Sequence, residues 1–497
     1  MNFKKSKSSR GGVTLKSIKL ASKVNLNVLC DCINGNINDN IYPDELKLAD
    51  ITPAFKNDES IRKVNYRPVS IFSGYSKIYE RVLYGQMNEF VSDKLSIHLC
   101  GFRKGYSTQY AIMNLIEKWR SHLDKKGIVG TILLDLSKAF DCLPHDLLIA
   151  KLEAYGFGID SLNMIHSYLT NRKQRVKVVS QYSSWSTVIK SVPQGSALGP
   201  LLFNIFINDL LFFIEDSEVC NFADDNTLSV CDFSLDEVIR KLEDDLHKTL
   251  NWLEVNGLVA NPKKFQFMLL GLKGKHNICI DIDGKIIKAT KSVKLLGVTI
   301  DQNLNFDVHI KELCEKANRN IGALRRIFHL IPYENSKILF KTFFESTFGY
   351  CPLIWMFSNK IPNNKLNNVQ KRALKILTDK HKLTHDELLK ETGCVKIHTR
   401  NLQLLMTEVY RTTKRINPPF MWDLLKHKQV NYNFRVQNLL QLPTTNTKTH
   451  GVRSFTYRGS ILWNYLSDEF KQISSLKLFK DKIKSWKGSM CMCKLCT

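Results

Sequence analysis

The sequence has no long uninterrupted hydrophobic run. Its most apolar stretch, Leu198–Ile214, is broken by Asn204, Asn208 and Asp209, which a membrane-spanning helix tolerates poorly. The first residues are rich in Lys and Ser and contain no apolar segment, so no secretory signal is visible. These absences argue against a membrane protein, and Leu198–Ile214 is predicted to be a buried helix.

Acidic residues are scarce relative to basic ones. The chain of 497 residues has 47 Asp and Glu against 72 Lys and Arg, a net charge of +25, and residues 1–23 contain no acid. This excess is larger than solubility requires and predicts a polyanionic partner, with nucleic acid favoured over a membrane surface. A basic surface without a specific partner is the alternative.

Regularly spaced cysteine pairs are also missing. The 13 cysteines are scattered from Cys30 to Cys496, mostly in apolar runs, which argues against a secreted disulfide scaffold and favours a reducing compartment. Near the C-terminus, Cys491, Cys493 and Cys496 offer three thiolates without an obvious fourth zinc ligand. The sequence leaves open whether this segment binds zinc or is a flexible tail.

Strands and helices alternate over Thr131–Ile300, with hairpins among them, which predicts an α+β fold with a mixed or antiparallel sheet. The best strand is the apolar run "GIVGTILLDLS", which carries Asp135 near its end. Beyond about Asn305 the pattern is mainly helical. We expect four segments: a basic arm with a short helix (1–40), a mixed domain (41–304), a helical domain (305–415) and a C-terminal region (416–497).

Two adjacent aspartates, Asp224 and Asp225, interrupt the β-prone stretch "VCNFADDNTLSV". Like charges repel and Asp is disfavoured inside strands, so these residues form either a solvated turn or a cation site. Asp135 also lies at the end of a predicted core strand. Three carboxylates without a nearby His or Cys favour magnesium, and two such ions suit in-line phosphoryl transfer.

Seven stretches in order resemble the reverse transcriptase of jockey-like, non-LTR retrotransposons. They are "NYRPVSIFSGYSKIYERV", "GFRKGYSTQYAIMNLIE", "LLDLSKAFDCLPHDLL", "VPQGSALGPLLFNIFINDL", "FADD", "NGLVANPKKFQFMLLG" and "KLLGVTID". Three later stretches are similar to the region after the polymerase in the same elements: "GYCPLIWMF", "NNVQKRALKIL" and "THGVRSFTYRGSILWNYL". The resemblance implies a right-hand polymerase with fingers and palm at 41–304, a helical thumb at 305–415 and an α-rich C-terminal region that binds nucleic acid.

The resemblance also assigns roles near the predicted carboxylate site. Asp135, Asp224 and Asp225 match the metal ligands, which implies two Mg²⁺ ions, replaceable by Mn²⁺. Lys264 matches a lysine that protonates or neutralises pyrophosphate, with a structural role as the equal alternative. Phe265 departs from the small residue expected beside it.

Further positions match nucleotide-binding and primer-binding residues. Phe140, five residues after Asp135, matches a side chain beneath the sugar that rejects a 2′-hydroxyl, and an ordinary core aromatic is its alternative. Leu296 and Gly297 match the turn that grips the primer end. The remaining matches to the incoming nucleotide or the template are Arg67, Arg103, Gln194 and Gly195.

These matches imply an RNA-directed DNA polymerase that extends a DNA primer with dNTPs on an RNA template. Such a protein would act in the nucleus and cytoplasm, and its oligomeric state is not indicated. Elements of this kind carry an endonuclease ahead of the polymerase, and we expect none before Leu48 in this sequence. A catalytically dead, nucleic-acid-binding remnant of a mobile element is the alternative function.

Overall fold

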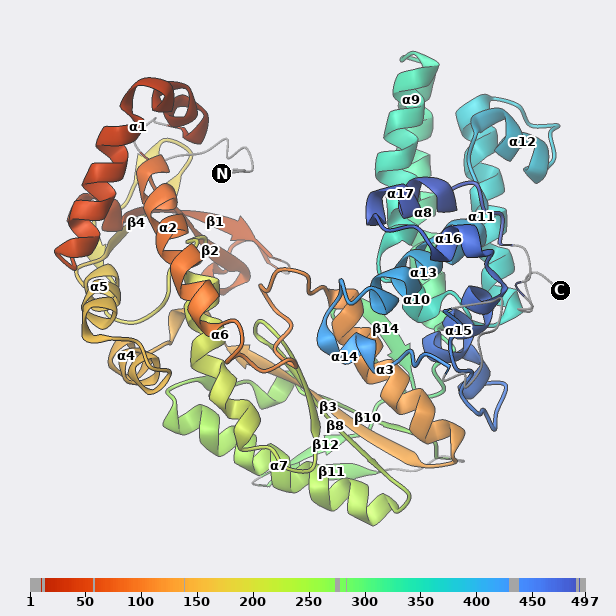
Figure 1. The fold of residues 1–497 in the computed structure, drawn as a ribbon, viewed down its shortest axis with the longest axis horizontal. Helices are drawn as coiled ribbons and strands as arrows, with labels where there is room; N and C mark the ends of the chain where they lie inside the picture. Colours follow the sequence, from red (N-terminus) through yellow and green to blue (C-terminus); the bar gives the residue numbers. More distant parts are fainter. Residues whose placement is uncertain are drawn as a thin grey trace.

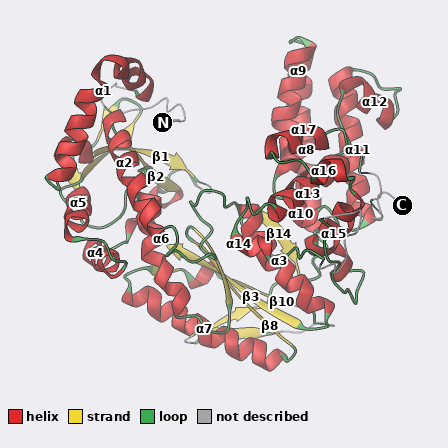
Figure 2. Cartoon of the chain, in the orientation of Figure 1, coloured by secondary structure: helices red, strands yellow, loops and turns green. Residues whose placement is uncertain are grey.

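The computed structural model of the chain describes residues 10, 14–56, 59–137, 139–272, 278–282, 284–428, 438–488 and 491. Two lobes stand at either end of a floor built from strands (Figure 1). The lobe nearer the N-terminus mixes helices and strands, whereas the other is built almost wholly from helices (Figure 2). This arrangement is the α+β fold predicted from the sequence.

An antiparallel sheet with the strand order β10–β3–β8–β7 forms the floor. Its centre is the strand predicted from the apolar run before Asp135, with Ile132 and Leu134 buried. The short β9 (Val259–Ala260) pairs with the end of this strand. The four main strands are β3 (Ile128–Ser137), β7 (Glu218–Phe222), β8 (Asp225–Asp232) and β10 (Gln266–Leu270).

Helix α7 (Leu235–Val255) covers one face of this sheet. The Ser234 side chain caps it by accepting a hydrogen bond from the Glu237 N–H. Its apolar stripe is buried against the strands, and Val238 approaches so closely that a Cβ at Gly130 would lie 2.5 Å from its Cγ1. Helix α7 therefore backs β3 and β8, the two central strands that carry Asp135 and Asp225.

The first lobe holds a second, mixed sheet in which β1 runs antiparallel to β2 and parallel to β4. The buried helix predicted at Leu198–Ile214 is split into α6 and a 3₁₀ turn at Asn208–Phe212. The strands are β1 (Leu48–Phe55), β2 (Tyr66–Ile71), β4 (Lys173–Val178), β5 (Gln181–Tyr182) and β6 (Ser186–Thr187). The helices are α2 (Gly74–Val91), α4 (His145–Ala154), α5 (Ile159–Leu169) and α6 (Gly199–Ile207).

The first helix, α1 (Leu15–Asn38), occupies most of the segment 1–40, in which the sequence predicts a basic arm and a short helix. The Thr14 side chain caps its start by accepting a hydrogen bond from the Ser17 N–H. The helix is therefore longer than the sequence predicts.

Two small hairpins link the floor to the second lobe: β11 (Cys279–Ile282) with β12 (Lys285–Lys288), and β13 (Ser292–Leu295) with β14 (Val298–Asp301). The lobe begins with α8 (Asp307–Phe328), close to the boundary expected at Asn305. The later helices are α9 (Tyr333–Leu339), α10 (Pro352–Trp355), α11 (Lys360–Thr378), α12 (His385–Thr392), α13 (Ile397–Thr413), α14 (Pro419–Trp422), α15 (Phe455–Tyr465), α16 (Asp468–Lys471) and α17 (Leu476–Ile483).

Helix α3 (Thr108–Asp124) joins the floor to the second lobe through three buried charged residues, Glu117, Arg120 and Asp124. Both carboxylates accept backbone N–H groups of the C-terminal segment, and Arg120 donates to a carbonyl there. The backbone partners are Phe455 and Thr456 for Glu117, Asn446, Thr447 and Gly451 for Asp124, and Arg453 for Arg120. The C-terminal segment thus docks on a helix that lies more than 300 residues earlier in the chain.

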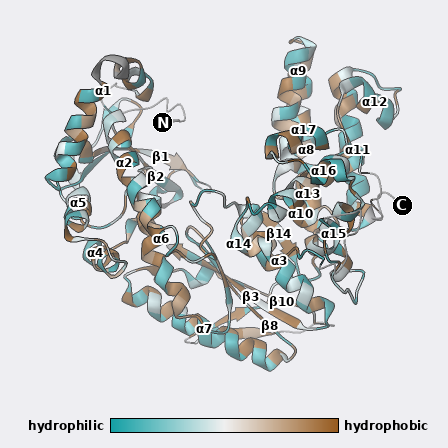
Figure 3. Cartoon of the chain, viewed as in Figure 1, coloured by the Kyte–Doolittle hydropathy of each residue, from teal (hydrophilic) through white to brown (hydrophobic). Residues whose placement is uncertain are grey.

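Apolar residues concentrate in the floor strands and on the inward sides of the helices (Figure 3). Within the residues that the structure describes, no helix is both long and apolar enough to cross a membrane.

Candidate active site

Asp224 lies in the tight turn of the β7–β8 hairpin, next to Ala223, whose φ is +60°. The buried side chain of Asn221 holds this turn by donating to the Ala223 carbonyl at 3.1 Å and to Asn226 Oδ1 at 2.7 Å. A left-handed φ is unfavourable for Ala and persists where neighbours impose it. The turn that presents Asp224 is therefore fixed from within.

A segment of the first lobe supports the same turn from outside. The Cys100 N–H donates to the Asn221 carbonyl at 2.9 Å, and the Asn221 N–H donates to the His98 carbonyl at 3.2 Å. A Cβ at Gly101 would collide with the Ala223 backbone, so this close approach requires glycine. The motif "GFRKGYS" thus begins with a residue that braces the hairpin.

Asp135 and Asp225 are directly opposite each other in the β3–β8 ladder. Side chains opposed in this way project from the same face of a sheet, with Cβ atoms roughly 5 Å apart. Asp224 adjoins them at the hairpin turn. The structure therefore brings together the three carboxylates that the sequence predicted as one site.

The charges in this site perturb one another. Burial, followed by repulsion from Asp224 and then from Asp135, raises the pKa of Asp225 to about 6, against an ordinary value of 3.8. Arg67 and Lys56 act in the opposite direction and lower it. The Asp225 side chain still has access to solvent, so the site is open on one side. A bound cation would relieve this repulsion.

The donor set fits magnesium, which takes oxygen ligands and in proteins is usually held by one or two carboxylates together with substrate phosphates and water. Among the described residues, no three His, Cys, Asp or Glu side chains converge closely enough to enclose an ion on their own. A site completed by nucleotide phosphates does not need such enclosure. Asp135, Asp224 and Asp225 are the residues that would hold the ions.

Lys264 donates its ammonium group to Asp135 Oδ2 at 2.9 Å. It is the last residue of a 3₁₀ turn (Pro262–Lys264), and Asn261, which precedes this turn, donates its N–H to the Asp135 carbonyl at 3.0 Å. The predicted lysine thus lies at the carboxylate site. Lys264 thus places a positive charge beside the Asp135 carboxylate. A role of Lys264 in neutralising or protonating pyrophosphate stays a prediction.

The two predicted arginines differ in their surroundings. Arg67 is exposed on β2, and its charge lowers the pKa of Asp225, so it faces the carboxylate site. The Arg103 guanidinium instead donates to the carbonyls of Ser92, Ser96 and Leu99 and lies 4.5 Å from the Tyr106 ring centre. These bonds bind α2 to the following loop, and we therefore leave Arg103 out of the proposed nucleotide site.

Gln194 and Gly195 form a loop that is held by three elements. The Gln194 side chain donates a hydrogen bond to Asp141 at 3.0 Å. The backbone carbonyl of Gln194 accepts one from the Ser70 N–H on β2 at 2.8 Å. Gly195 has a φ of +108°, and a Cβ there would lie 2.7 Å from the Ser70 carbonyl oxygen. The buried Glu80 carboxylate accepts hydrogen bonds from the N–H groups of Ala197 and Leu198, which lie between this loop and α6.

Phe140 is half-buried and stacks on Phe203 of α6, with ring centres 4.4 Å apart and an interplanar angle of 25°. Its other neighbour is Phe102, which meets it edge to face at 5.8 Å. This packing fixes the ring, as a steric gate requires, and a core aromatic would pack in the same way. Sugar selection by Phe140 stays a prediction.

Leu296 and Gly297 form the turn of the β13–β14 hairpin, both with left-handed backbone, at φ +45° and +83°. Tyr350, which precedes α10, donates its hydroxyl to the Leu296 carbonyl. The predicted primer-binding turn is therefore present as a tight hairpin, supported from the second lobe.

Sequence reasoning missed four residues that shape the site: Asn221, Asn226, Glu80 and Tyr350. Asn221 and Asn226 flank the aspartates in the motif itself, and two amides beside a tight turn are a recognisable signal. Glu80 and Tyr350 had no such signal, because the groups of the site that they bind are backbone groups distant in the chain.

Cys491 is buried, with Sγ 3.8 Å from His398 Nε2, whereas Cys493 and Cys496 lie outside the described residues.

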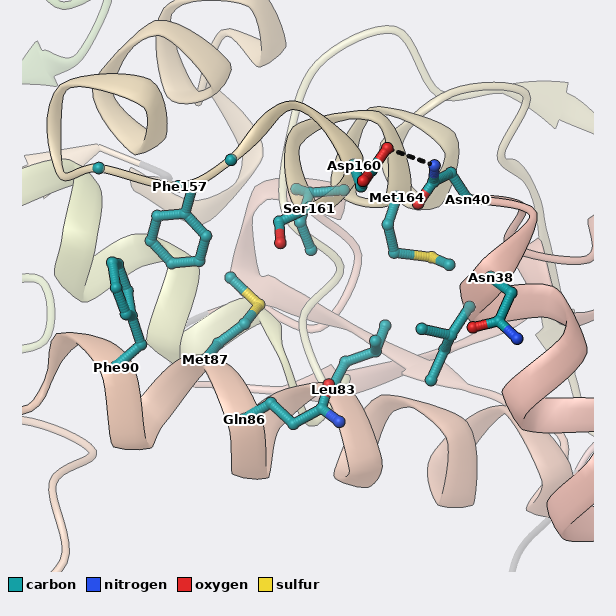
Figure 4. A pocket seen from close by; sticks show the side chains of 14 residues that line it. Asn38, Asn40, Leu83, Gln86, Met87, Phe90, Phe157, Asp160, Ser161 and Met164 are labelled. Carbon is teal, nitrogen blue, oxygen red and sulfur yellow. Dashed lines mark hydrogen bonds between the residues drawn. The ribbon is translucent and has the colours of Figure 1, made fainter.

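A cavity of about 500 Å³ lies away from the three aspartates, between α1, α2 and α5 (Figure 4). Leu83, Met87 and Phe90 of α2 form its apolar side, and Asn40 bonds Asp160 at its rim, with Nδ2 and Oδ1 3.0 Å apart. It contains none of the predicted site residues, and nothing in the described structure shows what would fill it.

Residues 56–300 match the family described as reverse transcriptase (RNA-dependent DNA polymerase). The chain is 27% identical over 381 residues to a probable RNA-directed DNA polymerase from transposon BS of Drosophila melanogaster, covering 74% of this chain and 42% of that protein. It is 24% identical over 319 residues to the RNA-directed DNA polymerase from mobile element jockey of the same species, covering 62% and 35%. The chain thus spans about two fifths of the length of the curated relatives that it matches.

Among solved structures, the chain is similar to telomerase from Candida albicans in complex with the TWJ fragment of telomeric RNA, at 13% identity and a TM-score of 0.40, with 72% of this chain and 68% of that chain covered. The α+β fold and the family match of residues 56–300 agree with the right-hand architecture that the sequence predicts. The sheet, its opposed carboxylates and the family match agree: residues 56–300 form a domain of the reverse transcriptase (RNA-dependent DNA polymerase) family.

Proposed function

We propose that this chain is an RNA-directed DNA polymerase of a non-LTR, jockey-like retrotransposon, and that it extends a DNA primer with dNTPs on an RNA template. The observation that carries the proposal is that Asp135 and Asp225 oppose each other across β3 and β8, with Asp224 close enough in the adjoining turn to repel Asp225. The net charge of +25 supplies the attraction to nucleic acid. We further propose that the protein acts in the nucleus and cytoplasm.

In the proposed reaction the primer 3′-hydroxyl loses its proton to water and its oxygen forms a bond to the α-phosphorus. The bond between the α-phosphorus and the bridging oxygen of the β-phosphate breaks, and pyrophosphate leaves with that electron pair. Magnesium bound by the three aspartates would supply Lewis acidity for this displacement. Arg67 faces the same site and would bind the triphosphate. Lys264 would neutralise Asp135 before the ions bind and then pyrophosphate as it leaves.

The loop Gln194–Gly195 would lie under the incoming base pair. The absence of a Cβ at Gly195 lets this loop pass close to the backbone of Ser70. The turn Leu296–Gly297 would hold the primer end. We propose fingers and palm at 41–304 and a thumb that starts at 305. The expected division at 415 runs through a shared core, in which α13 packs on α15 and α17. A nucleic-acid-binding role for 416–497 stays a proposal.

Primer extension with purified protein on RNA and DNA templates tests this function. Asp224→Asn removes a proposed ligand and is expected to abolish extension, while affinity for a primed template stays within a few-fold. Asp232→Asn is the matched control, because Asp232 lies at the far end of β8, about 23 Å from Asp225 at roughly 3.3 Å per residue. If the unaltered chain binds the template but extends nothing with Mg²⁺ or Mn²⁺, the proposal fails and a dead remnant is favoured.

A further inference from the structure

The turn Leu296–Gly297 rests on a side chain from the second lobe. Tyr350 donates its hydroxyl to the Leu296 carbonyl oxygen at 2.5 Å. A Cβ at Gly297 would lie 3.3 Å from Cε1 of the Tyr350 ring. The hydroxyl therefore holds the first residue of the turn, and the ring packs beneath the second.

This turn needs such support. Leu296 has a φ of +45°, a conformation that places the Cβ of an L-residue too close to the following carbonyl oxygen. Conformations of this kind persist where the surroundings impose them. The bond from Tyr350 constrains the carbonyl of the strained residue itself.

Tyr350 is anchored in turn. Its carbonyl accepts from Nε1 of Trp355, which is fully buried, at 3.1 Å. The next residue, Cys351, has a φ of +45°, and its Sγ lies 3.7 Å from Oγ1 of Thr108 at the start of α3. Tyr350 thus lies where the second lobe, helix α3 and the β13–β14 hairpin meet.

We propose that Tyr350 is a positioning residue for the primer end, acting through Leu296 and Gly297 and touching no reacting atom. This inference rests on the proposed function, in which that turn holds the primer. Because a small displacement of a reacting group slows bond formation steeply, loss of the hydroxyl should lower the maximal insertion rate. Binding of the nucleotide, which contacts other residues, should not change.

Tyr350→Phe removes the hydroxyl and keeps the ring. Tyr410→Phe is the matched control, because the Tyr410 hydroxyl also donates to a backbone carbonyl, that of Ile473, at 2.8 Å within the second lobe. Single-nucleotide insertion is measured at saturating primer–template. Tyr350→Phe should lower the maximal rate about tenfold with the KM for dNTP within twofold, whereas Tyr410→Phe should leave both within twofold.

A second measurement needs no chemistry. A primer with 2-aminopurine at its 3′ end fluoresces more strongly when that base is unstacked. Tyr350→Phe should raise this signal in the complex with template, and Tyr410→Phe should match the unaltered chain. Equal rates and equal fluorescence in the two variants would overturn the proposal, as would a raised KM with an unchanged maximal rate. An unaltered chain that binds but does not extend counts against the proposed function alone, since the fluorescence still decides the role of Tyr350.

Discussion

Asp135 and Asp225 face each other on neighbouring antiparallel strands, with the ammonium group of Lys264 on one and the charge of Arg67 near the other. Opposed like charges destabilise a sheet. Repulsion between these carboxylates therefore lowers the stability of the metal-free protein at the place where the proposed reaction needs anionic ligands. This effect can be measured by unfolding experiments without metal.

The first prediction concerns the pH dependence of stability. The pKa of Asp225 is raised to about 6 in the folded chain, so the folded state binds the proton more tightly than the unfolded state does. Ionisation of Asp225 therefore lowers the free energy of unfolding. This loss is absent below about pH 4 and complete above about pH 6. Asp225→Asn should therefore become more stable relative to the unaltered chain as the pH rises from 4 to 6. Urea unfolding in EDTA measures this, and millimolar Mg²⁺ should shrink the difference.

Asp232 gives the control of opposite sign. A hydrogen bond from Lys241, together with backbone N–H groups of Ser234 and Phe233, lowers the pKa of Asp232 to about 2. Its stabilising contribution is present above about pH 4 and is lost as the pH falls toward 2. Asp232→Asn should therefore be less stable than the unaltered chain above pH 4. Equal pH trends in the two variants would contradict the assignment of repulsion to the site.

The second prediction concerns Gly195→Ala. The added Cβ would lie 2.7 Å from the Ser70 carbonyl oxygen, in a backbone with φ +108°. The loop must shift away from β2, and primer extension should fall at least about tenfold, because 1 Å of misplacement in a site can cost far more. Gly105→Ala is the control, since Gly105 has a φ of +87° and open space around its Cα. Equal loss in both variants would mean that backbone strain alone is responsible.

The sequence predicted the palm well because its signals are local. A continuous apolar run predicted β3. It predicted the carboxylate site because Asp135, Asp224 and Asp225 carry the chemistry themselves. It did not predict Glu80 or Tyr350, which support the site by binding backbone groups 117 and 54 residues away. Every residue has such backbone groups, so the residue type does not reveal which of them is bound, and only the folded structure identifies these contacts.

The third prediction concerns the junction between palm and second lobe. Glu117→Ala would leave the N–H groups of Phe455 and Thr456 without their acceptor in a buried setting. Removing one partner of a buried charged hydrogen-bond network costs about 3–5 kcal/mol of unfolding free energy. Lys118→Ala should cost less than about 1 kcal/mol, since its ion pair with Glu218 is half-exposed. Urea unfolding compares the two, and a similar loss in both would show that the C-terminal segment is not held by α3.

The last prediction concerns sugar selection by Phe140. The reacting atoms of ribo- and deoxyribonucleotides are the same, so discrimination needs a surface where the 2′-hydroxyl would lie, and an aromatic ring excludes it by contact and offers no hydrogen bond. Stacking on Phe203 fixes the Phe140 ring. Phe140→Ala should raise ribonucleotide insertion relative to deoxyribonucleotide insertion at least about tenfold, roughly 1.4 kcal/mol in transition-state terms.

Phe102→Ala removes the edge-to-face neighbour of the same ring and controls for lost packing, so its ratio should change less than threefold. Single-nucleotide insertion with matched nucleotides measures the ratio, and an unchanged ratio in an active Phe140→Ala protein would assign this ring to the core alone.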